Sequence, residues 1–335
     1  MILNAQLGYV IIMLIDNYGR PWLKLRIVVN SVCNYRCIFC HFEGQGKFLS
    51  RELSAEDIGF VASVAKELGV DDFKITGGEP LLRRDIVKVV DEINKVDPKD
   101  LSLTTNGYLL DVYAKELLNH GLRRLNISLH SLDRRKYRFI TGVDALDKVL
   151  ENIDYVSGLG FKQIKLNVVV LRGLNTDEIP MMIRFAAKYG FVLQLIELMP
   201  MGDGFPVFAR YYDDLSDIVN WLNKHGKLLG TRKDLHNRPI YEVDGVKVEI
   251  VKNYNNPTFC AGCTTMRLTS DGRLKTCLYK EPVVDLWPYI KERDRDGLMK
   301  AMMYANSLRK PNFVEGASGD LSRIRIRVRV GSLVY

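Results

Sequence analysis

The sequence predicts a parallel α/β fold: an incomplete TIM-like barrel of six strand–helix units, followed by a smaller C-terminal domain. Short β-branched apolar segments alternate with amphipathic helical segments up to about residue 225, and hairpin patterns replace this alternation beyond it. A repeated strand–helix–strand order gives parallel strands joined by right-handed crossovers. We therefore place the barrel at residues 14–225 and the C-terminal domain at residues 226–335.

The predicted strands have the nearly continuous apolar composition of parallel strands that are buried on both faces. They are residues 25–29, 72–76, 101–105, 125–129, 164–170 and 192–198. Helical patterns lie between them, and the clearest covers residues 54–69, where Ser54 can cap the first turn and Gly69 can end the last. Residues 84–96 and 146–160 show the same spacing. Active sites of such folds lie at the C-terminal ends of the strands, where the motifs described below occur.

The predicted C-terminal domain contains two hairpins. Residues 241–251 are expected to turn at Asp244–Gly245, and residues 266–278 at Asp271–Gly272, because such dipeptides favour tight turns between strands. The last residues alternate arginine with apolar side chains, which predicts a basic edge strand protected against aggregation. The arginines concerned are Arg323, Arg325, Arg327 and Arg329.

Composition and charge exclude several classes of protein. Apolar residues make up 47% of the 335 residues, which supports a sizeable core. The net charge of +8 fits a polyanionic ligand or a basic surface, and no nucleic-acid motif accompanies it. The apolar run at residues 7–15 is too short to span a bilayer and lacks the flanks of a signal peptide. We therefore expect a soluble cytoplasmic protein that binds neither nucleic acid nor membrane; a homodimer is one possible assembly.

All six cysteines fall into two groups of three: Cys33, Cys37 and Cys40, then Cys260, Cys263 and Cys277. In a large chain without a secretion signal, such groups favour metal binding over disulfides. A 4Fe–4S cluster normally takes four thiolates, so three leave one iron open to a substrate or cofactor. The alternative for the first group is a zinc site, but its only nearby fourth ligand is His41, which is badly placed beside Cys40.

The Cx3CxxC spacing of the first group resembles the signature of the radical S-adenosylmethionine (SAM) superfamily. The aromatic residue between its last two cysteines and the "TGGEP" segment at residues 76–80 fit that superfamily too. The resemblance implies a barrel of the radical SAM type, whose open iron binds SAM and cleaves it to a radical that abstracts hydrogen. It also implies SAM contacts, with Glu79 accepting from the ammonium group of SAM. The residues implied are Phe39, Gly78, Glu79, Ser128 and Met199.

The second group resembles the second cluster site of the GTP 3′,8-cyclase family of molybdenum cofactor biosynthesis, in its archaeal form. Segments such as "LTTNG", "LNISLHSLD" and "LIELMPMG" follow in the family's order, and the likeness covers residues 14–280. The resemblance implies two 4Fe–4S clusters and the SAM-dependent cyclisation of GTP to (8S)-3′,8-cyclo-7,8-dihydroguanosine 5′-triphosphate. It also implies an electron donor such as ferredoxin or flavodoxin, and transfer of the product to cyclic pyranopterin monophosphate synthase.

The same resemblance implies a set of GTP contacts. They are Arg26, Lys74, Thr104, Lys165, Thr265, Met266 and Arg267. Lys165 is a charged residue in an otherwise apolar strand, which is costly unless it is paired, and a triphosphate would pair it. Thr265 and Gln194 depart from the family, because bacterial members carry basic residues there. The chain also lacks the bacterial Gly-Gly tail, so the arginine ladder at its end is an alternative source of the missing charge.

Two other functions fit parts of this pattern. One is a different radical SAM enzyme with an auxiliary cluster, such as a peptide-modifying enzyme, which would bind a peptide instead of GTP. The other is a structural iron–sulfur or zinc protein. Metal analysis distinguishes the enzyme from a zinc protein, because two 4Fe–4S clusters bring about eight irons per chain in place of two zincs.

Overall fold

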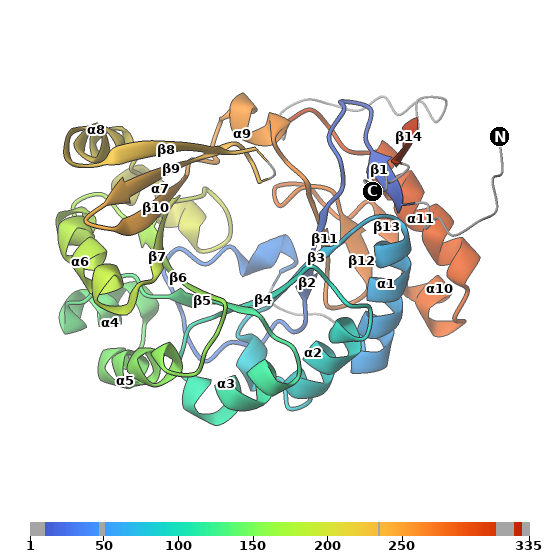
Figure 1. The fold of residues 1–335 in the computed structure, drawn as a ribbon, viewed down its shortest axis with the longest axis horizontal. Helices are drawn as coiled ribbons and strands as arrows, with labels where there is room; N and C mark the ends of the chain where they lie inside the picture. The colour runs from blue at the N-terminus through green and yellow to red at the C-terminus, as the bar shows by residue number, and fades with distance from the viewer. Residues whose placement is uncertain (1–10, 47–50, 234, 313–324, 330–335) are drawn as a thin grey trace, which may run out of the picture.

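The computed structural model describes residues 11–46, 51–233, 235–312 and 325–329. Six consecutive parallel strands form the centre of its main sheet, as the sequence predicts. They are β2 (Lys24–Val28), β3 (Asp72–Thr76), β4 (Asp100–Thr105), β5 (Arg124–Ser128), β6 (Gln163–Val170) and β7 (Val192–Glu197). Figure 1 shows that this sheet is curved and does not close on itself.

Six helices cover the outer face of the curved sheet (Figure 1). They are α1 (Ala55–Glu67), α2 (Ile86–Asn94), α3 (Leu110–Asn119), α4 (Arg134–Thr141), α5 (Leu146–Ser157) and α6 (Ile179–Tyr189). The first confirms the predicted cap, since Ser54 Oγ accepts from the backbone N–H of Asp57 at 3.1 Å and the Asp57 carboxylate accepts in return. Gly69 follows with φ of +87°, a conformation that favours glycine.

Strands from beyond residue 225 extend the same sheet at both edges. At one edge β10 (Val246–Val251) pairs parallel with β7, followed by the antiparallel β9 (Arg238–Val243) and β8 (Lys227–Arg232). At the other edge β11 (Thr265–Leu268) pairs parallel with β2, followed by the antiparallel β12 (Arg273–Lys275) and β13 (Val284–Asp285).

Both predicted hairpins are confirmed, as β9–β10 and β11–β12. Together the central and edge strands make one sheet of 12 strands. Strands from both sides of residue 225 share this sheet. The domain boundary at that residue stays a prediction.

The remaining elements lie around the edges of the barrel. The helices are α7 (Gly204–Tyr211), α8 (Ser216–His225), α9 (Pro257–Ala261), α10 (Trp287–Lys291) and α11 (Arg295–Ser307), with 3-10 turns at Phe42–Gly44, Pro80–Leu82 and Thr176–Glu178. A separate two-stranded sheet pairs β1 (Ile11–Ile15) antiparallel with β14 (Arg325–Arg329). The described part of the arginine ladder forms the strand Arg325–Arg329, and Arg323 lies outside the described residues. Across the described ranges, no helix is both long and apolar enough to cross a bilayer.

Candidate active site

The inner face of the curved sheet encloses a cavity of about 330 Å³. It gathers both cysteine groups and nearly all of the predicted contacts. The predicted residues that line it are Arg26, Cys33, Cys37, Phe39, Cys40, Lys74, Gly78, Glu79, Thr104, Ser128, Lys165, Met199, Cys260, Cys263, Thr265, Arg267 and Cys277. Met266 is the exception, because its side chain is fully buried in the hydrophobic core. Side chains alternate along a strand, so Thr265 and Arg267 face the cavity while Met266 faces away.

The first cysteine group lies in the loop that follows β2. Backbone bonds from Arg36 and Ile38 to the end of α4, at 2.9 and 3.0 Å, hold this loop across the mouth of the barrel. Cys33 is exposed, Cys37 and Cys40 are partly buried, and all three are free thiols. Within the described residues no three potential ligands converge to hold a single metal ion. The fit to a 4Fe–4S cluster therefore rests on the donor chemistry of three soft thiols at one end of the cavity.

The Gly77–Gly78 turn after β3 lies directly against this loop. The backbone N–H of Gly78 donates to the backbone oxygen of Asn30 at 3.1 Å and to its side-chain oxygen at 3.1 Å. A Cβ atom on Gly78 would come within 2.2 Å of the Val32 carbonyl oxygen and 2.5 Å of its carbon. Only glycine therefore allows the turn to approach the cysteine loop so closely.

Gly78→Ala is expected to displace the cysteine loop. The added methyl group meets backbone rather than a movable side chain, and overpacking of this kind costs ~1–3 kcal/mol. We expect a lower free energy of unfolding and less iron retained after reconstitution. Gly158→Ala is the matched control, because the nearest atom to its Cβ is 3.9 Å away. Equal stability and iron content in the two variants would contradict this role of Gly78.

Glu79 is buried and joins the turn after β3 to the loop after β4. Its carboxylate accepts from Thr105 Oγ1 at 2.7 Å, from the backbone N–H of Asn106 at 2.7 Å and from that of Leu81 at 3.0 Å. Burial raises the pKa of Glu79 to about 7, although these donors act in the opposite direction. The carboxylate therefore lines the cavity in a fixed orientation, and its contact with SAM stays a prediction.

His130 is a cavity residue that sequence reasoning missed. It lies two positions after Ser128, and its ring meets that of Phe39 edge-on at 4.5 Å between centroids. The backbone N–H of Val169 donates to His130 Nδ1 at 3.1 Å, so the ring proton of the neutral histidine is on Nε2. Burial lowers the pKa of His130 to about 3, which keeps the ring neutral. The histidine in "SLHSLD" was the available signal.

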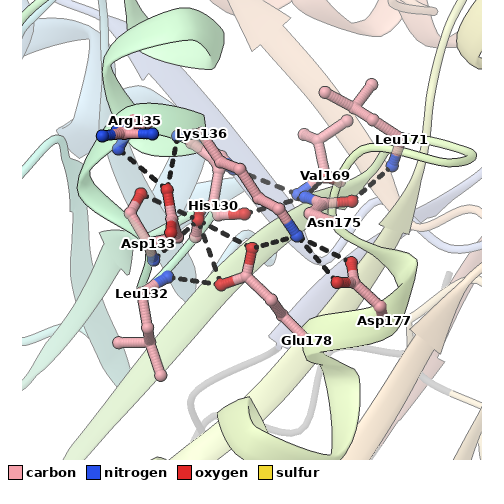
Figure 2. Close-up of polar contacts among 11 residues, drawn as sticks. His130, Leu132, Asp133, Arg135, Lys136, Val169, Leu171, Asn175, Asp177 and Glu178 are labelled. Atoms are coloured by element: carbon pink, nitrogen blue, oxygen red, sulfur yellow. Dashed lines mark hydrogen bonds and ion pairs between the residues drawn. The ribbon is translucent and has the colours of Figure 1, made fainter.

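A polar network holds the backbone on both sides of His130 (Figure 2). Asn175 donates to the carbonyl oxygens of His130 and Val169, at 2.7 and 2.9 Å. Glu178 accepts from Ser131 Oγ at 2.8 Å and from the backbone N–H of Leu132 at 2.7 Å. The loop after β5 is thereby fixed to the turn after β6, and the ring of His130 with it.

The second cysteine group lies at the edge formed by α9, β11 and β12. Two buried arginines hold its backbone: Arg20 donates to the carbonyl oxygen of Cys260 at 3.0 Å, and Arg309 donates to that of Cys263. Both arginines pair with the buried carboxylate of Asp16, at 2.7 and 3.3 Å. Segments from both ends of the chain therefore position the CxxC loop, a feature that sequence reasoning missed.

Lys165 has a protein partner that the sequence did not predict. Its ammonium group pairs with the buried carboxylate of Glu249 on β10, and Arg232 lies 3.4 Å from the same carboxylate. Burial opposes the charge of Glu249, but Lys165 and Arg232 together lower its pKa to about 2. Burial lowers the pKa of Lys165 to about 8 despite the attraction of Glu249. Glu249 therefore already pairs the charge of Lys165 within the protein, and a contact between Lys165 and a triphosphate stays a prediction.

Lys165→Met is expected to destabilise the fold by about 3 kcal/mol, because removing one member of a buried ion pair leaves an uncompensated charge. The double variant Lys165→Met/Glu249→Gln should recover most of this loss. The melting temperature and the free energy of unfolding measure both effects. The matched control is Lys162→Met at an exposed position of the same segment, which should leave stability unchanged. A single variant as stable as the control would show that the pair contributes nothing.

Arg26 also has a protein partner. Its Nη2 lies 2.8 Å from Oε1 of Glu43, which accepts from Thr76 Oγ1 at 2.8 Å as well. Burial opposes the charge of Glu43, but Arg26, His41 and Arg267 lower its pKa to about 2. Glu43 adopts a left-handed backbone conformation, with φ of +50°, to reach this position. Sequence reasoning did not identify it.

In the part of the chain that is described, three cations of the cavity lack the kind of carboxylate partner that Lys165 and Arg26 have. Lys74, Arg238 and Arg267 have no carboxylate within ion-pair distance among the residues that the structure describes. Burial lowers the pKa of each, and neighbouring cations lower it further. In the same described ranges, buried polar atoms of the cavity wall lack a hydrogen-bond partner. They include Arg26 Nε, Arg238 Nε, Arg267 Nε, Thr104 Oγ1 and Thr265 Oγ1.

Two family models match most of the chain and include both cysteine groups. The model of the radical SAM superfamily matches residues 27–186, and that of the molybdenum cofactor synthesis C-terminal domain matches residues 191–315. The chain is 53% identical over 306 residues to a probable GTP 3′,8-cyclase of Pyrobaculum aerophilum, covering 90% of this chain and 98% of that protein. It is 42% identical over 313 residues to a probable GTP 3′,8-cyclase of Metallosphaera sedula, covering 90% and 96%.

Solved structures share the fold at low identity. Streptococcus suis SuiB bound to SAM superposes with a TM-score of 0.61 at 17% identity, over 85% of this chain and 73% of that one. SuiB bound to its precursor peptide SuiA gives 0.60 at 17% identity, over 85% and 68%. At this identity the likeness establishes the incomplete barrel and nothing more specific.

Proposed function

We propose that this chain, which belongs to the radical SAM superfamily and to the archaeal GTP 3′,8-cyclases within it, cyclises GTP to (8S)-3′,8-cyclo-7,8-dihydroguanosine 5′-triphosphate. This reaction is the first step of molybdenum cofactor biosynthesis. Family membership supports the reaction type and the cofactors, which are SAM and two 4Fe–4S clusters. The assignment of individual residues is part of the proposal.

The group of cations without carboxylate partners carries the substrate assignment. Lys74, Arg238 and Arg267 face one cavity together with orphaned hydroxyl and guanidinium donors. An unsatisfied buried donor costs ~1–3 kcal/mol, and more when it is charged. The phosphate oxygens of a nucleoside triphosphate offer several negative charges and many acceptors to such a wall. A polyanion therefore suits this wall better than a neutral ligand does.

The first cysteine group would hold the cluster that binds SAM. Cys33, Cys37 and Cys40 provide three thiolates and leave one iron open. The cluster and SAM, when bound, supply a radical that abstracts hydrogen from the substrate. The chain's own residues would orient the cofactor: Phe39 and Met199 would offer apolar contact, and Gly78 keeps its backbone close beside the cysteine loop.

The second cysteine group would hold the other cluster at the edge formed by α9, β11 and β12. Cys260, Cys263 and Cys277 line the same cavity as the first group, so both clusters would face one substrate. The phosphates would lie against the cations, leaving the guanine to the second cluster.

The partners belong to this proposal as well. Cys33 is exposed, so an electron donor such as ferredoxin or flavodoxin can approach the first cluster from that side. Cyclic pyranopterin monophosphate synthase would receive the product. A homodimer and a cytoplasmic location are further expectations.

Ligand binding to the reconstituted protein tests the substrate assignment. Anaerobic calorimetry should give an affinity for GTP at least tenfold above that for guanosine, because only GTP reaches the cations with phosphates. The difference should shrink as salt is raised, since screening weakens the charge term. Equal affinities for GTP and guanosine, or binding of a peptide in place of both, would favour the peptide-modifying alternative.

A further inference from the structure

Arg238 is a cation of the cavity wall that no sequence motif identified, and it has no carboxylate within ion-pair distance among the described residues. It begins β9, which reaches the barrel only through β10. Its side chain lies among neutral groups: Nη1 is 3.5 Å from Gln194 Oε1, and Nη2 is 3.3 Å from Nδ1 of His236. Its guanidinium also lies 5.7 Å from the centroid of the Phe259 ring, beside the second cysteine group.

The charge of Arg238 is opposed by its surroundings. Burial lowers its pKa to about 10, with Glu249 acting against this shift and Arg232 and Arg26 adding to it. The guanidinium remains charged at neutral pH. Its Nε–H is buried and has no acceptor within the described part of the chain. Such a group is stabilised by an incoming anion that accepts its hydrogen bonds.

Its position relative to the other cations points to one ligand. Burial lowers the pKa of Lys74 on β3 and of His236, and Arg238 lowers both further; Arg267 on β11 also lowers that of His236. Lys74, Arg238 and Arg267 thus come from three different strands around one cavity, and neighbouring cations repel each of them. A ligand with charges spread over several groups relieves that repulsion at all three positions, which a single carboxylate cannot do.

We propose that Arg238 is a substrate-positioning residue that binds phosphate oxygens of GTP through its planar guanidinium group. The proposal rests on the function proposed above and adds a residue from outside the barrel. The guanidinium fork offers parallel N–H donors to two oxygens, which a lysine cannot. The β9–β10 hairpin is then part of the substrate site as well as an edge of the sheet.

The contact between Arg238 and Gln194 allows a test in which the two residues are exchanged. Arg238→Gln should weaken GTP binding by ~10- to 100-fold, as expected for the loss of a charged hydrogen-bonding partner. Guanosine binding should change less than about twofold, since guanosine has no phosphate. In Gln194→Arg/Arg238→Gln a guanidinium returns to nearly the same point, because the two side chains are 3.5 Å apart. This double variant should recover most of the lost affinity.

Controls separate this role from a structural one. Lys247→Gln, at an exposed position on the adjoining strand β10, should bind GTP like the parent protein. Arg238→Lys keeps a charge but loses the fork, so its affinity should be intermediate, and it replaces Arg238→Gln if that variant does not fold. Iron content and melting temperature are recorded for every protein.

The outcomes are distinguishable. If the parent protein binds GTP and Arg238→Gln binds it equally well, the assignment of Arg238 is wrong while the proposed function stands. If GTP and guanosine weaken together, Arg238 acts by packing on Phe259 and the assignment is again wrong. If the parent protein shows no preference for GTP over guanosine, the proposed function and this assignment fail together.

Discussion

Replacing Cys33, Cys37 or Cys40 by serine is expected to reduce the cleavage of SAM to 5′-deoxyadenosine to background. A hard hydroxyl replaces a soft thiolate in each variant, and a cluster held by two thiolates is lost or loses its open iron. The loop itself should keep its place, because its anchors to α4 are backbone hydrogen bonds. The measurement is chromatographic detection of 5′-deoxyadenosine under anaerobic reducing conditions.

The control for these variants is the melting temperature of the metal-free protein, which should be nearly unchanged. Undiminished 5′-deoxyadenosine formation in all three variants would contradict the assignment of the first cluster. If a variant loses activity because it no longer folds, the same melting curves will show this.

Replacing Cys260, Cys263 or Cys277 by serine is expected to abolish the cyclisation of GTP while SAM is still cleaved. The first group lies in a different loop with its own anchors, so its cluster and the cleavage of SAM should persist. Cyclisation of GTP should fall to background, because the cluster proposed to hold the purine is lost. Iron content should fall from about eight to about four atoms per chain.

A near-normal rate of GTP conversion in these variants would mean that the second group is only structural. The first-group variants serve as the reciprocal control, since they should lose SAM cleavage while retaining the iron of the second cluster.

The framework of the fold was accessible from the sequence because its signals are local. The apolar runs at residues 25–29 and 164–170 identify buried parallel strands without knowledge of their neighbours. The Asp-Gly pairs identify both hairpins for the same reason. Cysteine spacing is equally local, and the two groups that it identifies both line the cavity.

The partners of the charged residues were not accessible in this way. Lys165 and Glu249 are 84 positions apart, and Arg20 and Cys260 are 240 apart. Nothing near Lys165 indicates that β10 pairs with β7 and places a carboxylate beside it. Arg238 was missed for the same reason, since its strand joins the cavity only through this pairing.

The direction of the side chains along one strand could also have been predicted from the sequence. Strand side chains alternate, so consecutive residues such as Thr265, Met266 and Arg267 cannot all face one cavity. The apolar member of the three was the natural choice for the core, where Met266 lies fully buried.

Product analysis of an anaerobic incubation with GTP, SAM and dithionite tests the central claim most directly. We expect GTP to be consumed only when SAM and reductant are both present, with 5′-deoxyadenosine and (8S)-3′,8-cyclo-7,8-dihydroguanosine 5′-triphosphate formed in equal amounts. Formation of 5′-deoxyadenosine from a fully reconstituted protein, with GTP recovered unchanged, would contradict the proposed function.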